Sequence, residues 1–140
     1  MREPTTLPVV IQNMSKEQRH PDSVVLVVED EPIVRLDTAE TLQQRGLTVV
    51  EAATAADALK ILETRPEVRL VFTDMGIPGR IKGMDLARLV HQYWPHILLV
   101  ITSGGERPDE GEIPDAGRFI AKPYSPEQVA GEIDELLRKD

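Results

Sequence analysis

The sequence contains no cysteine among its 140 residues. This absence excludes disulfide bonds, thiolate metal sites and cysteine nucleophiles, and it fits a reducing compartment. Long apolar runs are missing too, since none approaches the roughly 20 residues that span a membrane. The apolar patch LPVVI near the N-terminus is shorter than the core of a signal peptide, which is about 7–15 residues long. We therefore expect a soluble, cytoplasmic protein that binds no membrane.

Basic residues are in the minority. The sequence has 16 lysines and arginines against 24 aspartates and glutamates, which makes a net charge of −8. Nonspecific binding to nucleic acid or to an anionic membrane relies on a basic surface, so neither is expected as the main partner. The acidic balance is compatible with metal cations and with basic proteins.

The length and the hydrophobic fraction predict one globular domain. A chain of 140 residues with 41% hydrophobic residues can enclose one sizeable core but is too short for two ordinary domains. Its first 22 residues contain several prolines and polar residues and show no sustained hydrophobic period. We therefore divide the chain into a flexible extension, residues 1–22, and a folded domain, residues 23–140.

From residue 23 onward, strand and helix patterns alternate along the chain. Apolar, β-branched runs predict strands, and apolar residues at helical spacing predict helices. Pro32 suits the first position of a helix, and Thr54 and Ser125 suit N-caps. The predicted strands cover residues 23–29, 47–52, 68–74, 96–104 and 118–124, and the helices cover 32–46, 54–65, 84–94 and 125–139. This order predicts an α/β fold in which helices cover both faces of a doubly wound parallel sheet.

One connection breaks the alternation. Residues 103–117, SGGERPDEGEIPDAG, are rich in glycine and proline and contain almost no apolar residues where a helix would be expected. We expect a short or irregular fourth helix there, or a loop.

The predicted strands end in polar residues. In an open α/β sheet, ligands bind beyond the carboxyl ends of the strands. The first strand ends in Glu29 and Asp30, the third in Asp74, the fourth in Thr102, and the fifth reaches Lys122. Because the strands are parallel, we expect acids, a hydroxyl and an amine to meet at one edge of the sheet.

Carboxylates gathered at one edge repel one another. At about 5 Å and an effective dielectric constant near 20, each pair costs about 3 kcal/mol, so either one carboxylate takes a proton or a cation lies among them. Oxygen ligands without histidine or cysteine suit Mg2+. A lysine and a hydroxyl nearby would complete a phosphoryl site. Asp74 stands alone at the end of its strand and is the best candidate for a nucleophile that forms an acyl phosphate.

Four segments, taken in order, resemble a known family. VVEDEP, FTDMGIPG, VITSG and FIAKPY are similar to the motifs of the receiver domain of bacterial two-component response regulators, of the chemotaxis-regulator type. The resemblance covers roughly residues 24–139. It implies a flavodoxin-like (βα)5 fold with five parallel strands in the order 2-1-3-4-5.

The resemblance also implies a phosphoacceptor and a metal site. Asp74 would accept a phosphoryl group from a histidine kinase, with Mg2+ bound and Mn2+ as a substitute. Asp30 would bind the metal directly, together with Asp74 and the backbone carbonyl of Gly76, and Glu29 would be the adjacent metal-binding acid. Glu29 stands where aspartate is more frequent, and Gly76 lacks a side chain that often influences the phosphoryl lifetime.

The remaining family residues would stabilise the phosphoryl group and transmit the signal. Thr102 matches the switch hydroxyl, Phe119 the switch aromatic, and Lys122 the lysine that pairs with the phosphoryl group. The bond from Lys122 to Pro123 is expected to be cis, which is cheap only before proline. Phe119 lacks the hydroxyl of many relatives, and the loop before Gly83 is one residue longer than in the chemotaxis regulator.

Taken singly, these residues also have ordinary structural explanations. Acids before a helix favour its N-terminus, and Glu31 is expected to cap the helix that Pro32 begins. Asp74 suits a turn before glycine and proline, and Lys122 suits a solvated loop. For Ser103 we expect turn chemistry rather than phosphate binding. Separate structural explanations do not account for the whole set, because all these groups fall at one edge of one predicted sheet.

The sequence thus predicts a single-domain response regulator. The chain ends after the last helix, so we expect no DNA-binding output domain and no enzyme activity beyond its own phosphorylation and dephosphorylation. Its partners would be a sensor histidine kinase or phosphotransfer protein and an unidentified downstream protein, with a phosphorelay or phosphate sink as related roles. Two alternatives stay open: an interaction module that needs no phosphate, and an aspartate-dependent phosphohydrolase. The latter usually has a second aspartate two residues after the nucleophile, where this chain has Gly76.

Overall fold

The computed structural model describes residues 23–105, 108, 111, 113 and 117–139. The predicted extension over residues 1–22 lies outside the described residues, as does most of the irregular segment. No helix in the described part of the chain is long and apolar enough to cross a membrane.

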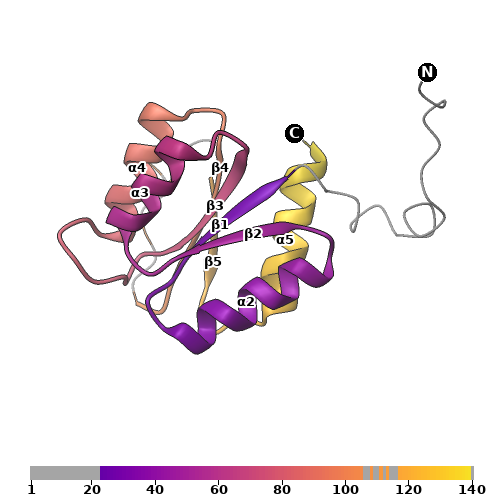
Figure 1. The fold of residues 1–140 in the computed structure, drawn as a ribbon. Helices are drawn as coiled ribbons and strands as arrows, with labels where there is room; N and C mark the ends of the chain where they lie inside the picture. Colours follow the sequence, from indigo (N-terminus) through magenta and orange to yellow (C-terminus); the bar gives the residue numbers. More distant parts are fainter. Residues whose placement is uncertain (1–22, 106–107, 109–110, 112, 114–116, 140) are drawn as a thin grey trace, which may run out of the picture.

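The five predicted strands form one parallel sheet in the order β2-β1-β3-β4-β5, so the predicted topology is confirmed (Figure 1). β1 lies in the interior of the sheet and is buried along its whole length, as its unbroken β-branched sequence predicts. The strands are β1 (Val24–Val28), β2 (Thr48–Ala52), β3 (Val68–Asp74), β4 (Leu98–Ser103) and β5 (Gly117–Ala121).

Four α-helices in the described part of the chain cover the two faces of the sheet (Figure 1). They are α2 (Pro32–Gln44), α3 (Ala55–Thr64), α4 (Gly83–Tyr93) and α5 (Pro126–Lys139). Alternate residues of β1 point to opposite faces: Leu26 joins the core beneath α3 and α4, and Val27 joins the core beneath α2 and α5. The result is a three-layer sandwich with an apolar core on each side.

Local signals set most helix starts. Pro32 occupies the first turn of α2. The hydroxyl of Thr54 accepts a hydrogen bond from the N–H of Asp57 at 3.1 Å, and the hydroxyl of Ser125 accepts one from the N–H of Gln128 at 3.0 Å. Both predicted N-caps are therefore confirmed. The prediction for Glu31 is wrong in one respect, because Glu31 occupies the N-cap position of α2 but its side chain makes no capping hydrogen bond.

The register of the sheet places the polar strand ends side by side. Asp74, the last residue of β3, pairs with Thr102 on β4, which pairs in turn with Ile120 on β5. The loop after β3 then returns close to that strand: a Cβ atom on Gly83 would lie 2.2 Å from the carbonyl oxygen of Asp74. A glycine at this position therefore allows α4 to begin against the end of β3.

The connection between β4 and β5 contains no α-helix among its described residues, which are 104, 105, 108, 111 and 113. The expected short or irregular fourth helix, or loop, falls mostly outside the described residues and stays a prediction.

Candidate functional site

An ion pair between Asp74 and Lys122 lies at the carboxyl edge of the sheet. The Nζ atom of Lys122 donates to Oδ2 of Asp74 at 2.6 Å, and the N–H of Gly76 donates to Oδ1 at 2.8 Å. The side chain of Asp74 is 8% exposed and that of Lys122 is 29% exposed. Partial burial lowers the pKa of Lys122, but the hydrogen bond to Asp74 and the charges of Asp74 and Glu29 raise it overall, so Lys122 stays protonated.

Lys122 reaches Asp74 because the backbone after β5 is held against β4. The N–H of Lys122 donates to the carbonyl oxygen of Ser103 at 3.0 Å, and the N–H of Met75 donates to the carbonyl oxygen of Thr102 at 2.8 Å. The peptide bond between Lys122 and Pro123 is cis. Residues far apart in sequence thus meet through the extension of the parallel hydrogen-bonding pattern beyond the strand ends.

The two acids after β1 occupy different environments. Glu29 is 2% exposed, and its Oε2 atom accepts a hydrogen bond from the N–H of Glu31 at 3.0 Å. Its Oε1 atom is buried and has no hydrogen-bond partner. Asp30, by contrast, is exposed. Burial raises the pKa of Glu29 to about 7; the hydrogen bond from Glu31 opposes the shift and the charge of Asp74 reinforces it.

The hydroxyl of Thr102 lies on the strand next to Asp74. Thr102 is fully buried, and its Oγ1 atom has no hydrogen-bond partner. The neighbouring Ser103 stabilises the turn that follows it, because its Oγ atom accepts a hydrogen bond from the N–H of Gly105 at 3.1 Å. This is the turn chemistry predicted for Ser103. Phe119 on β5 is half-buried and packs against the core beneath α3 and α4. In the sheet it pairs with Ile101, the residue before Thr102.

Several predicted residues line one open hollow of about 500 Å³ at this edge. Its lining includes Asp30, Asp74, Gly76 and Lys122, with Ser103 and the glycines that follow it. Glu29 lies behind this lining, since it is buried and feels the charges of both Asp74 and Lys122. The hollow exposes a carboxylate and an amine to a ligand from solution.

The donor atoms suit a hard cation, although they form no complete metal cage. Among the described residues, no group of three or more histidine, cysteine, aspartate or glutamate side chains is arranged to hold a metal ion. Mg2+ needs few protein ligands, because it keeps several waters and binds phosphate oxygens. The unpartnered Oε1 of Glu29 and the exposed carboxylate of Asp30 are oxygen donors of the required kind. The residues present therefore fit Mg2+, and the predicted ligands, which also include Asp74 and the carbonyl of Gly76, stay a prediction.

Sequence reasoning missed Arg35, which contacts the acidic loop. Its Nη1 atom donates to the backbone carbonyl oxygen of Glu29 at 2.8 Å, and its Nε atom donates to the carboxylate of Glu51 at 3.2 Å. Arg35 follows Glu31 by one helical turn, and that spacing is the only signal that could have drawn attention to it. Its actual acceptors depend on how β1 and β2 pair.

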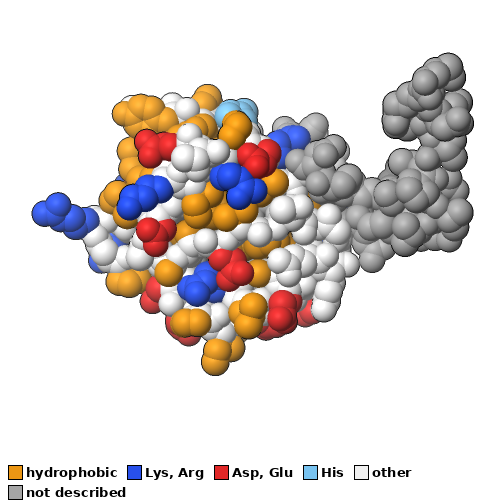
Figure 2. Space-filling model, viewed as in Figure 1, with side chains coloured by type: hydrophobic (Ala, Val, Ile, Leu, Met, Phe, Trp, Pro, Cys, Tyr) orange, Lys and Arg blue, Asp and Glu red, His pale blue; other side chains and the backbone are white. Residues whose placement is uncertain are grey.

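The surface shows no separation of charge on the face seen in Figure 2, where acidic and basic side chains are interspersed. Hydrophobic side chains protrude at the bottom of this view, and α2 carries the exposed Ile33 and Leu36. This face has no continuous basic surface of the kind on which nonspecific nucleic-acid binding relies.

Known proteins share this sequence pattern. The family model for the response regulator receiver domain matches residues 25–134. The sensor kinase CckA of Brucella abortus is 36% identical over 121 residues, which cover 84% of this chain and 13% of that protein. The phyllosphere-induced regulator PhyR of Methylorubrum extorquens is 28% identical over 81% of this chain and 43% of its own length. The chain thus spans less than half of either protein.

Other relatives have a length close to that of this chain. Protein PilG of Pseudomonas aeruginosa is 32% identical over 124 residues, which cover 84% of this chain and 89% of that protein. The crystal structure of a response regulator receiver protein from Sinorhizobium medicae superposes with a TM-score of 0.75 at 25% identity, covering 83% of this chain and 94% of that one. A CheY-like receiver domain protein from Methanospirillum hungatei shares the fold with a TM-score of 0.70 at 23% identity, covering 84% of this chain and 98% of that one.

Proposed function

Because the chain belongs to the response regulator receiver domain family, we propose that it is a phosphorylation switch in which Asp74 accepts the phosphoryl group. The donor would be a phosphohistidine on a sensor histidine kinase or a phosphotransfer protein. The observation that carries the proposal is the ion pair from Lys122 Nζ to Asp74 Oδ2, 2.6 Å long and at the mouth of an open hollow.

In the proposed transfer, a carboxylate oxygen of Asp74 forms a bond to phosphorus while the bond from phosphorus to the donor imidazole nitrogen breaks. The imidazole leaves with the electron pair and takes a proton from solvent, and the product is an acyl phosphate. The transferred group has charge on its oxygens throughout, so fixed positive charge is what the protein has to supply. Lys122 is already protonated and in place, and the N–H of Gly76 holds the other oxygen of the carboxylate.

Mg2+ is part of this proposal. Asp30, Asp74 and the carbonyl oxygen of Gly76 would hold the ion, with Glu29 beside them. When bound, the ion supplies positive charge to the phosphoryl oxygens and offsets the repulsion among the carboxylates. A buried glutamate whose pKa is about 7 is consistent with this arrangement, because a cation would favour its ionised form.

The response to phosphorylation is proposed to pass through Thr102 and Phe119. The hydroxyl of Thr102 is buried beside Asp74 with no partner, so it is free to donate to a new phosphoryl oxygen. Phe119 lies on the next strand and is only half-buried, so it has room to move when the edge of β4 is rearranged. The changed surface would then bind a downstream protein.

The proposal can be tested with phosphoramidate, whose P–N bond resembles that of a phosphohistidine. With Mg2+ present, intact-mass spectrometry should detect one added phosphoryl group on the wild-type protein. Asp74→Asn should abolish this uptake, whereas Asp57→Asn, which changes an exposed aspartate on α3, should leave it unchanged.

Two results would contradict the proposal. Stable uptake by Asp74→Asn would move the phosphoacceptor elsewhere. Absence of both phosphoryl uptake and Mg2+ binding in the wild-type protein would favour the alternative of an interaction module that works without phosphate.

A further inference from the structure

We propose that Arg35 is a positioning residue for the metal site, because it fixes the loop that presents Asp30. This inference rests on the proposed function, since it concerns the Mg2+ site of the same phosphoacceptor. Arg35 does not contact the phosphoryl group in this role. It acts on the backbone from which the exposed metal ligand extends.

The loop between β1 and α2 is tied down at both peptide groups that flank Asp30. The carbonyl of Glu29, which belongs to the peptide before Asp30, accepts from Nη1 of Arg35 at 2.8 Å. The N–H of Glu31, which belongs to the peptide after Asp30, donates to the side chain of Glu29 at 3.0 Å. The backbone around Asp30 is thus restrained although its side chain is exposed to solvent.

Arg35 connects this loop to two other elements. Its own N–H donates to the carbonyl of Glu31 at 2.9 Å, which is part of the first turn of α2. Its Nε atom donates to Glu51 on β2, and the next residue on that strand, Ala52, accepts from the N–H of Glu29 at 3.0 Å. The guanidinium therefore links the loop to both α2 and β2. Its fixed planar geometry suits hydrogen bonds to two acceptors at once, here the carbonyl of Glu29 and the carboxylate of Glu51.

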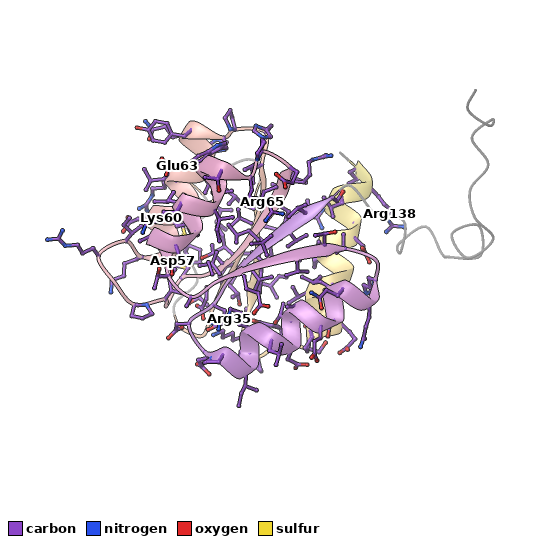
Figure 3. The ribbon with its side chains drawn as sticks, in the orientation of Figure 1. Arg35, Asp57, Lys60, Glu63, Arg65 and Arg138 are labelled. Carbon is purple, nitrogen blue, oxygen red and sulfur yellow. The ribbon has the colours of Figure 1, made fainter. Side chains whose placement is uncertain are left out.

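The guanidinium lies between the start of α2 and the end of β2, and in Figure 3 it is well separated from Arg65 at the end of α3. Its side chain is 21% exposed, so it is more buried than that of Arg65, which is 40% exposed. Arg65 also donates from Nε to a carboxylate, that of Glu67, at 2.7 Å. Arg65 is therefore a matched control: it is the same residue in the same kind of ion pair, and the hydrogen bonds that it donates go to Ile61 and Glu67 rather than to the loop between β1 and α2.

Electrostatics alone predicts the opposite effect from positioning. Arg35 is a positive charge close to acidic ligands, so its removal should strengthen the binding of a cation if charge were all that mattered. If Arg35 holds Asp30 in place, its removal should weaken Mg2+ binding, because residues that orient metal ligands typically contribute about 10-fold to 100-fold in affinity. The sign of the change therefore separates the two explanations.

The experiment is a titration of the wild-type protein and its variants with Mg2+ alone. Binding is measured by calorimetry and, in parallel, by the amide NMR signals of Asp30 and Gly76. Arg35→Ala is expected to weaken binding roughly tenfold, and Arg65→Ala to leave it unchanged. Arg35→Lys keeps the charge but reaches one acceptor at a time, so it should give an intermediate loss. At saturating Mg2+, Arg35→Ala should recover phosphoryl uptake from phosphoramidate.

A measurement without metal completes the test. Hydrogen exchange at the N–H of Glu31 should be faster in Arg35→Ala than in Arg65→Ala, with thermal melts verifying that both variants fold. If Arg35→Ala binds Mg2+ as tightly as the wild-type protein, or more tightly, the positioning role is overturned while the proposed function stands. If the wild-type protein binds no Mg2+, this role of Arg35 fails; if it also takes up no phosphoryl group from phosphoramidate, the proposed function fails as well.

Discussion

Two ion pairs in this protein look alike in distance and burial but differ in their surroundings. Arg45 donates from Nη1 to Oδ2 of Asp134 at 2.5 Å, and Lys122 donates to Oδ2 of Asp74 at 2.6 Å. The two aspartate side chains are 1% and 8% exposed. By these measures alone, neither pair would be singled out as functional.

The Arg45 pair lies between two helices that pack against each other. Arg45 is the residue that ends α2, and Asp134 is on α5, so their contact ties together the two helices that share one face of the sheet. Apolar residues of the same core flank it, including Leu42 on α2 and Ile133 on α5. Its position is explained by helix packing.

The Lys122 pair lies at the edge of the sheet, in an open hollow with further polar atoms that lack partners. The hydroxyl of Thr102 and the Oε1 atom of Glu29 are both buried without hydrogen bonds. Unpartnered buried polar groups destabilise a fold, and functional sites are where they are usually found. The comparison teaches that the position of an ion pair, rather than its length or burial, separates the two: one borders an open hollow at the carboxyl edge of the sheet, and the other lies between packed helices.

The largest expected effect on stability belongs to the helix-packing pair. Arg45→Ala should lower the free energy of unfolding by roughly 3 kcal/mol, because it removes the charged hydrogen-bond partner of a carboxylate that is only 1% exposed. Lys122→Ala should cost only about 1 kcal/mol, because Asp74 keeps the hydrogen bond from Gly76 and borders an open hollow. Urea denaturation of both variants would measure the difference.

A double variant sharpens this contrast. Arg45→Met with Asp134→Leu should recover most of the lost stability and retain phosphoryl uptake, since a structural ion pair is replaceable by apolar residues. Equal losses for Arg45→Ala and Lys122→Ala would show that the two pairs do not differ in the way proposed.

A change in pH should alter the free energy of unfolding through the titration of Glu29, by an amount between those expected for Arg45→Ala and Lys122→Ala. The pKa of Glu29 rises from 4.5 to about 7 on folding, so between these values the folded protein binds a proton that the unfolded chain releases. The contribution of Glu29 to the free energy of unfolding should therefore be fully present below pH 4.5, and it should fall by on the order of 2 kcal/mol between pH 5 and about 7. Glu29→Gln should flatten this slope in denaturation curves recorded from pH 5 to about 8.

The smallest expected effect on stability comes from replacing Thr102, and this substitution should stabilise the fold, whereas Arg45→Ala and Lys122→Ala should destabilise it. Thr102→Val removes a buried hydroxyl that has no partner, so the free energy of unfolding should rise by up to about 1 kcal/mol. The same substitution at Thr54 removes the N-cap of α3 and should lower it by about 1 kcal/mol. With beryllofluoride and Mg2+, Thr102→Val should also show weaker NMR shifts at Phe119. Loss of stability in Thr102→Val would mean that this hydroxyl supports the fold.

Local sequence signals predicted well where neighbouring residues decide the structure. Thr54 and Ser125 cap the helices that follow them because each hydroxyl reaches an N–H only three residues away. The same logic was wrong for Glu31, whose side chain makes no cap. Its own N–H is instead taken by the carboxylate of Glu29, a residue that is buried because its strand is central to the sheet. A local rule fails there because the outcome depends on the burial of a neighbour.

The sequence by itself determined the alternation of strands and helices, the order of the sheet through its family resemblance, and the set of residues at the strand ends. These follow from the hydrophobic periods and from short polar motifs, which act over a few residues. Only the tertiary structure decided which polar atoms meet: Lys122 with Asp74 across 48 positions, Arg45 with Asp134 across 89, and Arg35 with the carbonyl of Glu29. The physical reason is that these contacts depend on strand register and helix packing, and both are set by the burial of the whole core.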